Sequence, residues 1–345
     1  MNKINSKIKV GVAVSGGVDS AVAAGMLKAA GFEVFGVFAR LLDGKSEDEW
    51  RAAAVCEKLR IPFFAIDLRA QFEKRIINKF IGDTKKGLTP NPCVFCNQEI
   101  KFGLLMDVIL RSGADYFATG HYCQIKIDQS EIYHLFKGKD KEKDQSYFLW
   151  RLKQKQLKKI IFPLGVFQKN EIKELAKSWK LPVKDNSESQ DVCFVFGKTM
   201  DFLKKYLGKN SGDVVDADTK KIIGRHDGLW FYTIGQRKGI GLSGGPFYVV
   251  AKNFAKNRLI VAKKIPAANL VKLSNLNWIA AAAQDLPLKV KAKIRYRAKE
   301  SAAVLDRSGK NYVLRFATPQ FAATPGQSAV FYHGNELIGG GTIKF

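Results

Sequence analysis

The first two hundred residues alternate between short apolar runs and longer amphipathic stretches. Residues 8–14 form a run rich in β-branched side chains, which predicts a buried strand. Residues 19–30 predict an amphipathic helix that ends at Gly31. The alternation continues with predicted strands at 33–39, 62–67 and 116–119 and predicted helices at 48–59 and 171–179. Strands separated by helices are typical of a parallel sheet with crossover helices, so residues 1–205 are predicted to form a doubly wound α/β domain.

The pattern changes near residue 205, where helical periodicity gives way to short apolar runs with turn residues between them. Predicted strands lie at 213–215, 230–234, 247–251, 258–262, 290–297, 302–305, 312–316 and 329–333. Runs of this length and spacing favour small all-β units. We expect a small central β-rich domain at 206–270 and a C-terminal β-barrel at 271–345.

Composition adds a strong bias of charge. The 345 residues include 57 Lys and Arg against 32 Asp and Glu, a net charge of +25, with 46% hydrophobic residues. The apolar content excludes a disordered or collagen-like chain. The charge predicts a polyanionic partner, with nucleic acid favoured over an anionic membrane surface. No apolar stretch approaches the ~18 residues of a membrane span, and residues 1–10 do not resemble a signal peptide, so a cytoplasmic protein is expected.

The turn after the first predicted strand has the composition of an anion-binding loop. It reads Ser-Gly-Gly-Val-Asp-Ser at residues 15–20. Gly16 and Gly17 allow close approach of the backbone, and the N–H groups of the following helix point towards an anion. Asp19 could cap that helix or hold Mg²⁺. The alternative is a tight turn that uses glycine for packing alone. The lysine of a Walker A motif is absent.

A second glycine motif, G-x-G-x-x-G at 239–244, is not expected to bind a nucleotide. A predicted strand follows it rather than a helix, so no helix N-terminus would face a pyrophosphate.

Five cysteines occur in the chain, an odd and sparse set for a disulfide framework. Cys93 and Cys96 form a C-x-x-C pair. This pair is open to three interpretations: half of a zinc or iron–sulfur site, with Cys123 and Cys193 to complete it, a redox pair, or a loop that carries one nucleophile. Cys193 is an isolated cysteine before an apolar run, and is either a functional thiol or a small buried hydrophobe.

Several strings of the chain resemble known families. The hexapeptide at 15–20 resembles the pyrophosphate loop of the adenylating ATP pyrophosphatases. Further strings resemble signatures of the tRNA-specific 2-thiouridylases, in family order over nearly the whole chain. They are TPNPCVFCNQEIKF at 89–102, GHY at 120–122, KDQSYFL at 143–149, FPLG at 162–165, SQDVCF at 189–194, YTIGQRKGIG at 232–241, KIRYR at 293–297 and ATPGQSAVFY at 323–332.

This resemblance implies a fold like that of the adenine nucleotide α-hydrolases and a defined chemistry. The family uses ATP with Mg²⁺ to adenylate O2 of the wobble uridine, U34, in the anticodon stem-loop of tRNA, and then replaces that oxygen with sulfur. AMP and pyrophosphate are released. Cys96 matches the family's nucleophile and Cys193 its persulfide carrier, which implies a sulfur-relay protein or cysteine desulfurase as a partner. A disulfide between Cys96 and Cys193 would be the by-product, to be reduced before the next turnover.

The resemblance also assigns binding residues. The positions matching ATP contacts are Ala13, Val14, Ser15, Gly16, Gly17, Val18, Asp19, Ser20, Ala39 and Gly120. The positions matching contacts to the target base or to tRNA are Asn91, Pro92, Cys93, His121, Lys143, Asp144, Gln145, Arg295, Tyr296 and Gln327. No resident metal site is implied.

Two departures from the family pattern stand out: Cys93 occupies a position where many members have Asp, and the segment at 41–50 is short. Three rival functions stay open: an amide-forming adenylating ligase, a non-catalytic RNA-binding protein that retains a nucleotide loop, and a metal-dependent thiolase.

Overall fold

The structure is a computed structural model that describes residues 7–44, 46–183, 192–195, 197–280, 285–309 and 311–344. Within the described residues, a parallel sheet has the strand order β3-β2-β1-β4-β7. Its strands are β1 (Lys9–Ala13), β2 (Glu33–Arg40), β3 (Phe63–Asp67), β4 (Tyr116–Ala118) and β7 (Ile160–Ile161). The predicted doubly wound α/β fold of the N-terminal part is therefore confirmed.

Helices pack on one face of this sheet through small and branched side chains. They are α1 (Val18–Ala29) and α2 (Ser46–Lys58), and α8 (Lys169–Ser178) packs on α1. In β1, Val10 and Val12 are fully buried, and Ala24 and Leu27 of α1 join them in one core cluster. Burial of these strands from both sides explains why β1 and β2 read as nearly continuous apolar runs.

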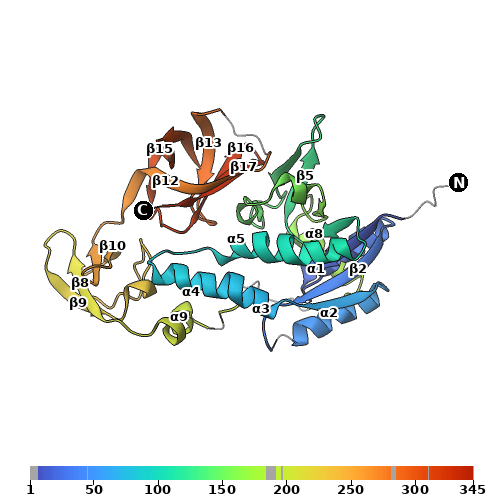
Figure 1. The fold of residues 1–345 in the computed structure, drawn as a ribbon, viewed down its shortest axis with the longest axis horizontal. Helices are drawn as coiled ribbons and strands as arrows, with labels where there is room; N and C mark the ends of the chain where they lie inside the picture. Colours follow the sequence, from blue (N-terminus) through green and yellow to red (C-terminus); the bar gives the residue numbers. More distant parts are fainter. Residues whose placement is uncertain are drawn as a thin grey trace.

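The other face is covered by a helical layer over residues 69–111, which the sequence analysis left unassigned. It comprises α3 (Arg69–Phe72), a π-helix η1 (Glu73–Ile77), α4 (Asn78–Lys85), α5 (Pro92–Cys96), a second π-helix η2 (Asn97–Leu105) and α6 (Met106–Arg111). Figure 1 shows this layer extending from the parallel sheet towards the central β-sheet, below the barrel. The π-helical hydrogen bonds change the spacing of the buried side chains, which obscures the 3.6-residue period that predicts a helix.

A hairpin and further helices connect the parallel sheet to the rest of the molecule. The hairpin is β5 (Cys123–Ile127) and β6 (Tyr133–Lys137), and the helices are η3 (Ser146–Phe148), α7 (Gln154–Leu157) and α9 (Thr199–Leu207). Strand β6 pairs with β17 of the barrel through Glu336–Phe136 and Leu337–Leu135. A segment from the N-terminal part thus extends the C-terminal sheet, an arrangement that the sequence analysis missed.

The remaining residues form two β units, as predicted. A small sheet has the order β10-β11-β8-β9, with β8 (Gly212–Asp216), β9 (Ile222–His226), β10 (Tyr248–Asn253), β11 (Arg258–Ala262) and the short 3₁₀-helix η4 (Leu229–Phe231). The barrel runs β12-β15-β14-β13-β16-β17 and closes through pairing of β17 with β12. Its strands are β12 (Ala267–Trp278), β13 (Leu288–Lys293), β14 (Ser301–Ser308), β15 (Asn311–Phe321), β16 (Ser328–His333) and β17 (Glu336–Ile343).

Two predicted strands are wrong in detail. Residues 230–234 contain the end of η4 instead of a strand, because Leu229 and Phe231 both turn into the core. The strand predicted at 290–297 ends at Lys293, and the chain then turns so that Tyr296 packs against Phe148, with ring centroids 4.5 Å apart. The domain boundaries at 205/206 and 270/271 stay a prediction.

Candidate active site

The loop at residues 15–20 joins the carboxyl end of β1 to α1 and is held by its own serines. Ser20 Oγ accepts a hydrogen bond from the Ser15 backbone N–H at 3.0 Å and donates one to the Gly17 carbonyl at 3.0 Å. Gly16 has φ of +77°, and a Cβ there would lie 2.6 Å from the Asp48 carbonyl oxygen of α2. No side chain caps the N-terminus of α1. Its first N–H groups are therefore available to an anion.

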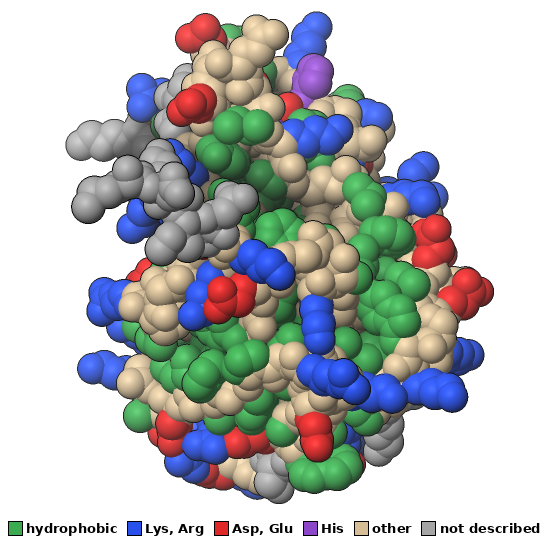
Figure 2. Space-filling model, turned by 90° about the vertical axis from the view of Figure 1, so that its right-hand side faces the viewer, with side chains coloured by type: hydrophobic (Ala, Val, Ile, Leu, Met, Phe, Trp, Pro, Cys, Tyr) green, Lys and Arg blue, Asp and Glu red, His purple; other side chains and the backbone are tan. Residues whose placement is uncertain are grey.

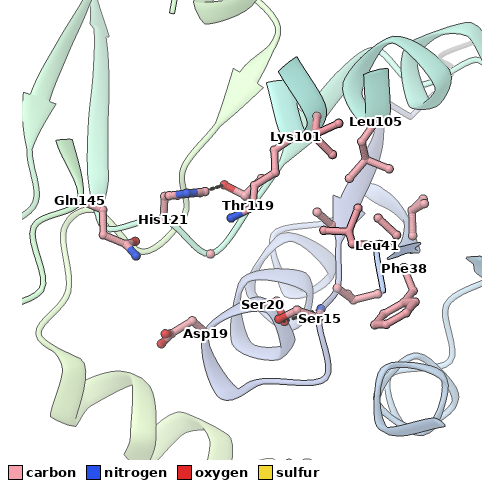
Figure 3. Close-up of a pocket in the computed structure, with 16 residues that line it drawn as sticks. Ser15, Asp19, Ser20, Phe38, Leu41, Lys101, Leu105, Thr119, His121 and Gln145 are labelled. Carbon is pink, nitrogen blue, oxygen red and sulfur yellow. Dashed lines mark hydrogen bonds between the residues drawn. The ribbon is translucent and has the colours of Figure 1, made fainter. Parts of the chain in front are cut away.

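A cavity of about 250 Å³ opens at this loop, at the carboxyl ends of β1, β2 and β4. Figure 3 shows the loop, the end of η2 and the segment after β4 facing one another across it. Its lining residues are Ala13, Val14, Ser15, Asp19, Ser20, Val37, Phe38, Ala39, Leu41, Ile100, Lys101, Leu105, Thr119, Gly120, His121 and Gln145. Crevices at the carboxyl ends of parallel strands are where open α/β sheets bind ligands.

Most of the predicted ATP contacts meet at this cavity. The lining residues among them are Ala13, Val14, Ser15, Asp19, Ser20, Ala39 and Gly120, whereas Gly16, Gly17 and Val18 belong to the loop without lining the cavity. His121 and Gln145, which the resemblance assigns to tRNA, line the same cavity. Sequence reasoning missed Lys101, Phe38 and Leu41.

Asp19 does not cap α1. Its carboxylate instead contacts Tyr122, which follows β4, and Lys169, at the start of α8. Its Oδ1 accepts a hydrogen bond from the Tyr122 hydroxyl at 2.7 Å, and Lys169 Nζ lies 2.7 Å from both carboxylate oxygens. Lys169 begins α8 and its side chain is only 12% exposed. This ion pair fixes the loop to α8 across 150 residues of sequence.

The segment after β4 approaches α1 closely. A Cβ on Gly120 would lie 2.8 Å from the carbonyl carbon of Asp19 and 2.9 Å from the Ser20 nitrogen, so only glycine fits without displacement. The next residue, His121, shares a hydrogen bond of 2.7 Å between its Nδ1 and Thr119 Oγ1. Burial lowers the pKa of His121 well below its usual value, and the charge of Lys101 lowers it further. The imidazole is therefore neutral near pH 7.

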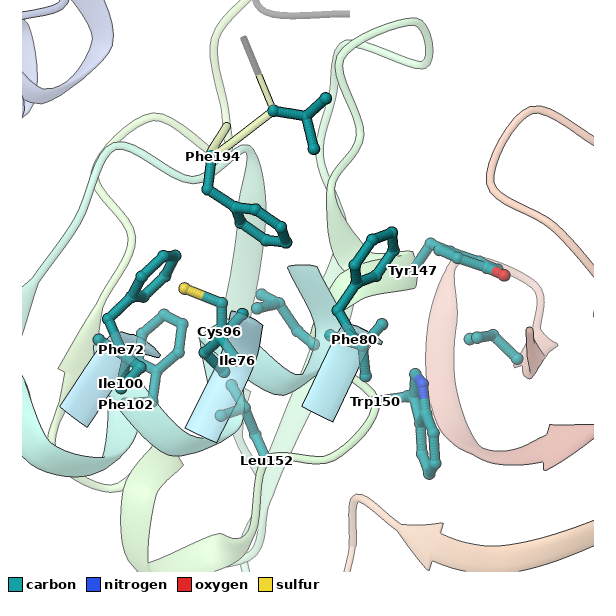
Figure 4. Close-up of a cluster of buried hydrophobic side chains, with 14 of the residues drawn as sticks. Phe72, Ile76, Phe80, Cys96, Ile100, Phe102, Tyr147, Trp150, Leu152 and Phe194 are labelled. Atoms are coloured by element: carbon teal, nitrogen blue, oxygen red, sulfur yellow. The ribbon is translucent and has the colours of Figure 1, made fainter. Parts of the chain in front are cut away.

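Cys96 is the last residue of α5, within the helical layer. The side chain is 8% exposed and belongs to a core cluster with Phe72 and Phe194. Figure 4 shows its sulfur between these two rings. Burial raises the pKa of the Cys96 thiol to about 12, and the positive charge of Lys101 opposes this rise.

Cys193 is brought to Cys96 by the residue that follows it. Phe194 is 3% exposed and packs edge-to-face on Phe72 and Phe80, with ring centroids at 5.9 and 5.5 Å. Cys193 itself is exposed, and its charge as a thiolate raises the pKa of Cys96 and of Cys93. The three sulfurs thus lie within electrostatic range of one another, and all are thiols rather than a disulfide. Ser189 to Asp191 of the same motif lie outside the described residues.

Family comparisons agree with this architecture. A family model for a tRNA methyl transferase HUP domain matches residues 8–197. Models for a tRNA methyl transferase PRC-barrel domain and an aminomethyltransferase beta-barrel domain match residues 200–263 and 268–343.

Curated relatives give a more specific result. The chain is 43% identical over 340 residues to the tRNA-specific 2-thiouridylase MnmA of Syntrophomonas wolfei subsp. wolfei, which covers 97% of this chain and 100% of that protein. This chain belongs to the tRNA-specific 2-thiouridylase family. The 2-thiouridylase MnmA of Streptococcus sanguinis is 38% identical over 358 residues, covering 98% of this chain and 96% of that protein. One solved structure is described as a predicted subunit of tRNA methyltransferase from Methanocaldococcus jannaschii. It matches 49% of this chain and 74% of its own, with 19% identity and a TM-score of 0.32, which is too low to support an argument.

In this member of the 2-thiouridylase family, both β units hold the loop that precedes α5. Gln327 Nε2 donates to the Thr89 carbonyl at 2.8 Å, and the Thr89 N–H donates to the Pro325 carbonyl at 2.8 Å. From the central sheet, Lys252 Nζ donates to the Gly87 carbonyl at 3.1 Å, and burial lowers the pKa of this lysine to about 8. Gln327, assigned to tRNA by resemblance, therefore has a structural partner here.

That loop leads directly into the residues assigned to the target base. Asn91 is the N-cap residue of α5, and Pro92 occupies its first turn, where a missing N–H is tolerated. Cys93 follows them and is exposed, whereas Pro92 is buried. Asn91 to Cys93 thus form the start of the helix that ends at Cys96.

The predicted tRNA contacts at 143–145 and 295–296 meet at the boundary between the barrel and the N-terminal part. Asp144 is buried and accepts hydrogen bonds from the backbone N–H groups of Gly138 and Ser146, both at 3.1 Å. The Tyr296 hydroxyl donates to the Asp144 carbonyl at 3.2 Å. Asp144 and Tyr296 thus have structural contacts of their own in this protein.

Three other residues predicted to contact tRNA are Gln145, Lys143 and Arg295. Gln145 Oε1 accepts from the Tyr122 N–H at 3.1 Å and lines the cavity. The Lys143 N–H donates to Asp140 Oδ1 at 3.1 Å. Arg295 lies in a second hollow of about 410 Å³, together with Arg297 and Lys299.

The basic excess is not confined to one spot. On the face in Figure 2, Lys and Arg side chains are spread over the surface among acidic ones. Across the described residues, no group of three His, Cys, Asp or Glu is placed to hold a metal ion, and no helix has the length and apolar character to cross a membrane.

Proposed function

We propose that this chain uses ATP to replace O2 of the wobble uridine of tRNA with sulfur. The observation that carries the proposal is that η2, which begins directly after Cys96, lines the same cavity as the anion-binding loop, and that Cys193 lies within electrostatic range of Cys96. The full-length similarity to proteins described as tRNA-specific 2-thiouridylases supports it. Neither the ligase nor the binding-protein alternative requires the Cys96 and Cys193 thiols. A cytoplasmic setting is part of this proposal.

In the first step, ATP binds with its phosphates at residues 15–20 and the N-terminus of α1. O2 of the uracil attacks the α-phosphorus, the bond to the β-phosphate oxygen breaks, and pyrophosphate leaves. AMP is then bonded to C2 through oxygen, which makes that oxygen a good leaving group. His121 is neutral and lines the cavity, so it can accept or donate hydrogen bonds without adding charge.

We infer that Mg²⁺ arrives with the ATP phosphates rather than at a preformed site. Mg²⁺ commonly binds one or two carboxylates together with substrate phosphates and water. Asp19 is the acidic residue among the described cavity-lining residues, and Lys169 occupies both of its oxygens. Asp19 therefore fits a role in holding the loop better than a role as a direct metal ligand.

In the second step, Cys193 carries a persulfide, delivered by a sulfur-relay protein or a cysteine desulfurase. Its terminal sulfur attacks C2, the C2–O bond breaks, and AMP leaves with the oxygen and its electron pair. The Cys96 thiolate then attacks the Cys193 sulfur and breaks the persulfide bond, which leaves the terminal sulfur on C2 as a thione. Cys96 and Cys193 end as a disulfide, which a dithiol reductant returns to two thiols. The exposure of Cys193 suits an external sulfur donor.

The tRNA must present an extruded base, because the reacting carbon is hidden in the anticodon stack. We propose that Asn91 to Cys93 lie beside that base and that Lys143 and Arg295 contact the tRNA backbone, with affinity that falls as salt rises. Tyr296, Asp144 and Gln327 would then act mainly by shaping this surface, since each already has a partner within the protein.

The test is nucleoside analysis of unmodified tRNA after incubation with the protein, ATP, Mg²⁺ and a persulfide donor. We expect 2-thiouridine together with AMP and pyrophosphate. Cys96→Ser and Cys193→Ser should each abolish the product and retain tRNA binding. Cys56→Ala, which alters a fully buried thiol in the core cluster of β1 and α1, is the control. A parallel reaction with S-adenosylmethionine tests the methyl-transfer description of the family models. Methylated uridine without thiouridine would refute the proposal.

A further inference from the structure

Lys101 lies at the nucleotide cavity and has no role in the reaction steps proposed above. It lies in η2, lines the nucleotide cavity, and is the only lysine or arginine among the described residues that line it. Figure 3 shows its side chain reaching from the helix towards Thr119 and His121. Two further cations near the loop are already paired, Lys169 with Asp19 and Arg51 with Glu47 and Asp48. Lys101 is thus the cation best placed to face an anion in the cavity.

The π-helix places the same residue on the side of Cys96. Lys101 follows Cys96 by five residues, and η2 spans Asn97–Leu105. In an α-helix, two side chains five residues apart are separated by a rotation of about 500° about the helix axis, so they point roughly 140° away from each other. In a π-helix the backbone hydrogen bonds join residues five apart, so such residues lie one above the other. The wider turn therefore brings Lys101 over the end of α5.

The charge environment agrees with this geometry. The positive charge of Lys101 lowers the pKa values of Cys93, Cys96 and His121. For Cys96 this charge opposes the effect of burial. A single ammonium group therefore acts on the nucleotide cavity and on the buried thiol together.

We propose that Lys101 is a catalytic residue of this site, which contacts the phosphate of the adenylated uridine and stabilises the Cys96 thiolate. The inference rests on the proposed function. As the C2–O bond breaks, the oxygen leaves with AMP, and the ammonium balances the negative charge of that leaving group. After AMP departs, the same ammonium favours the ionised form of Cys96 that attacks the Cys193 sulfur. One cation thus serves the departure of AMP and the release of sulfur in turn.

The first measurement concerns the thiol alone and needs no tRNA. In a Cys93→Ser, Cys193→Ser background, the alkylation rate of Cys96 by iodoacetamide is followed against pH by peptide mass spectrometry. Cys56 and Cys123 are fully buried and are resolved as separate peptides. Lys101→Gln should move the midpoint of the Cys96 profile to higher pH, whereas Lys101→Arg should keep it near that of the parent.

The second measurement follows single-turnover formation of 2-thiouridine with all other cysteines intact. Lys101→Gln should lower the rate by about 100-fold, the usual effect of removing one group that stabilises developing charge, and Lys101→Arg should recover part of it. Lys79→Gln is the matched control. Lys79 lies near the same segment, 4.5 Å from the Phe95 ring centre and paired with Asp83, but it does not line the cavity. Its removal should change neither measurement.

The outcomes separate this proposal from the proposed function. An unchanged alkylation midpoint in Lys101→Gln, or an unchanged thiolation rate, would overturn the role of Lys101. If the parent protein forms no 2-thiouridine, the proposed function fails, and the role of Lys101 in that reaction fails with it. The alkylation profile still reports in that case on the contact between Lys101 and Cys96. If Lys101→Gln does not fold, Lys101→Met takes its place beside the Lys79→Gln control. A raised Cys96 midpoint and slower thiolation in Lys101→Met support the role, and a match to the parent in both overturns it.

Discussion

Phe194 is the anchor that keeps Cys193 beside Cys96, so its removal should separate the two thiols. The side chain is 3% exposed and meets Phe72 and Phe80 edge-to-face. Burial of a phenylalanine side chain contributes about 1.5–3 kcal/mol. Each aromatic pair adds about 0.5–1.5 kcal/mol. Phe194→Ala should therefore weaken docking of this segment by about 4 kcal/mol, within the range of roughly 3–5 kcal/mol seen for such truncations.

A loss of about 4 kcal/mol corresponds to a change of roughly 1,000-fold in the ratio of docked to undocked segment. The assay is the rate at which Cys96 and Cys193 form a disulfide under mild oxidation, in a Cys93→Ser background. Because two thiols must meet before they can be oxidised to a disulfide, we expect the rate to fall at least roughly tenfold, and at most by the full change in docking. Thiolation should fall in parallel.

Phe316→Ala is the control for general destabilisation, because Phe316 is comparably buried at 5% exposure but lies in the core of the barrel. It should lower the free energy of unfolding and leave the oxidation rate unchanged. A Phe194→Ala protein that oxidises as fast as the parent would refute the argument that this ring positions Cys193.

Three further predictions follow from single contacts. Gly120→Ala should weaken ATP binding in calorimetry, since the added Cβ would lie 2.8 Å from the backbone of Asp19; unchanged affinity would contradict it. Lys169→Met should lower the free energy of unfolding, measured by chemical denaturation, by about 1.5–3 kcal/mol, because Asp19 then keeps the Tyr122 hydroxyl but loses its charged partner. A loss of stability no larger than that for replacing an exposed lysine would argue against it. His134 contacts Glu336, and this contact raises the pKa of His134. His134→Gln should therefore lower the free energy of unfolding below about pH 6.5, and the loss should fade as pH rises through the raised pKa. A loss of stability that grows towards pH 9 would exclude this.

Local sequence patterns were enough to predict the parallel sheet and its loop. A β-branched run buried on both faces, a pair of glycines and an amphipathic helix are encoded within about twenty residues, and β1, the loop and α1 form where they were predicted. Hydrophobic period and turn chemistry act over these short distances, so they can be read without knowledge of the rest of the chain. The barrel was predicted for the same reason, although its extension by β5 and β6 was not.

The thiols were found by motif, but their surroundings were not. Cys96 is buried and Cys193 exposed, and no local pattern predicts either exposure. The proximity of Lys101 to Cys96 depends on η2 being a π-helix, which has no marked periodicity of its own in the sequence. Gln327 and Tyr296 were expected to contact tRNA, and only packing of the barrel against the N-terminal part gives them partners at Thr89 and Asp144.

The sequence by itself thus determined the kinds of element, the position of the glycine-rich loop and the family to which the chain belongs. Only the tertiary structure decided which side chains share the site, because these contacts join residues far apart in the chain. Lys169 and Asp19 are 150 positions apart and lie 2.7 Å from each other. The physical reason is that backbone periodicity is a local property, whereas the cavity is made where separate elements pack together.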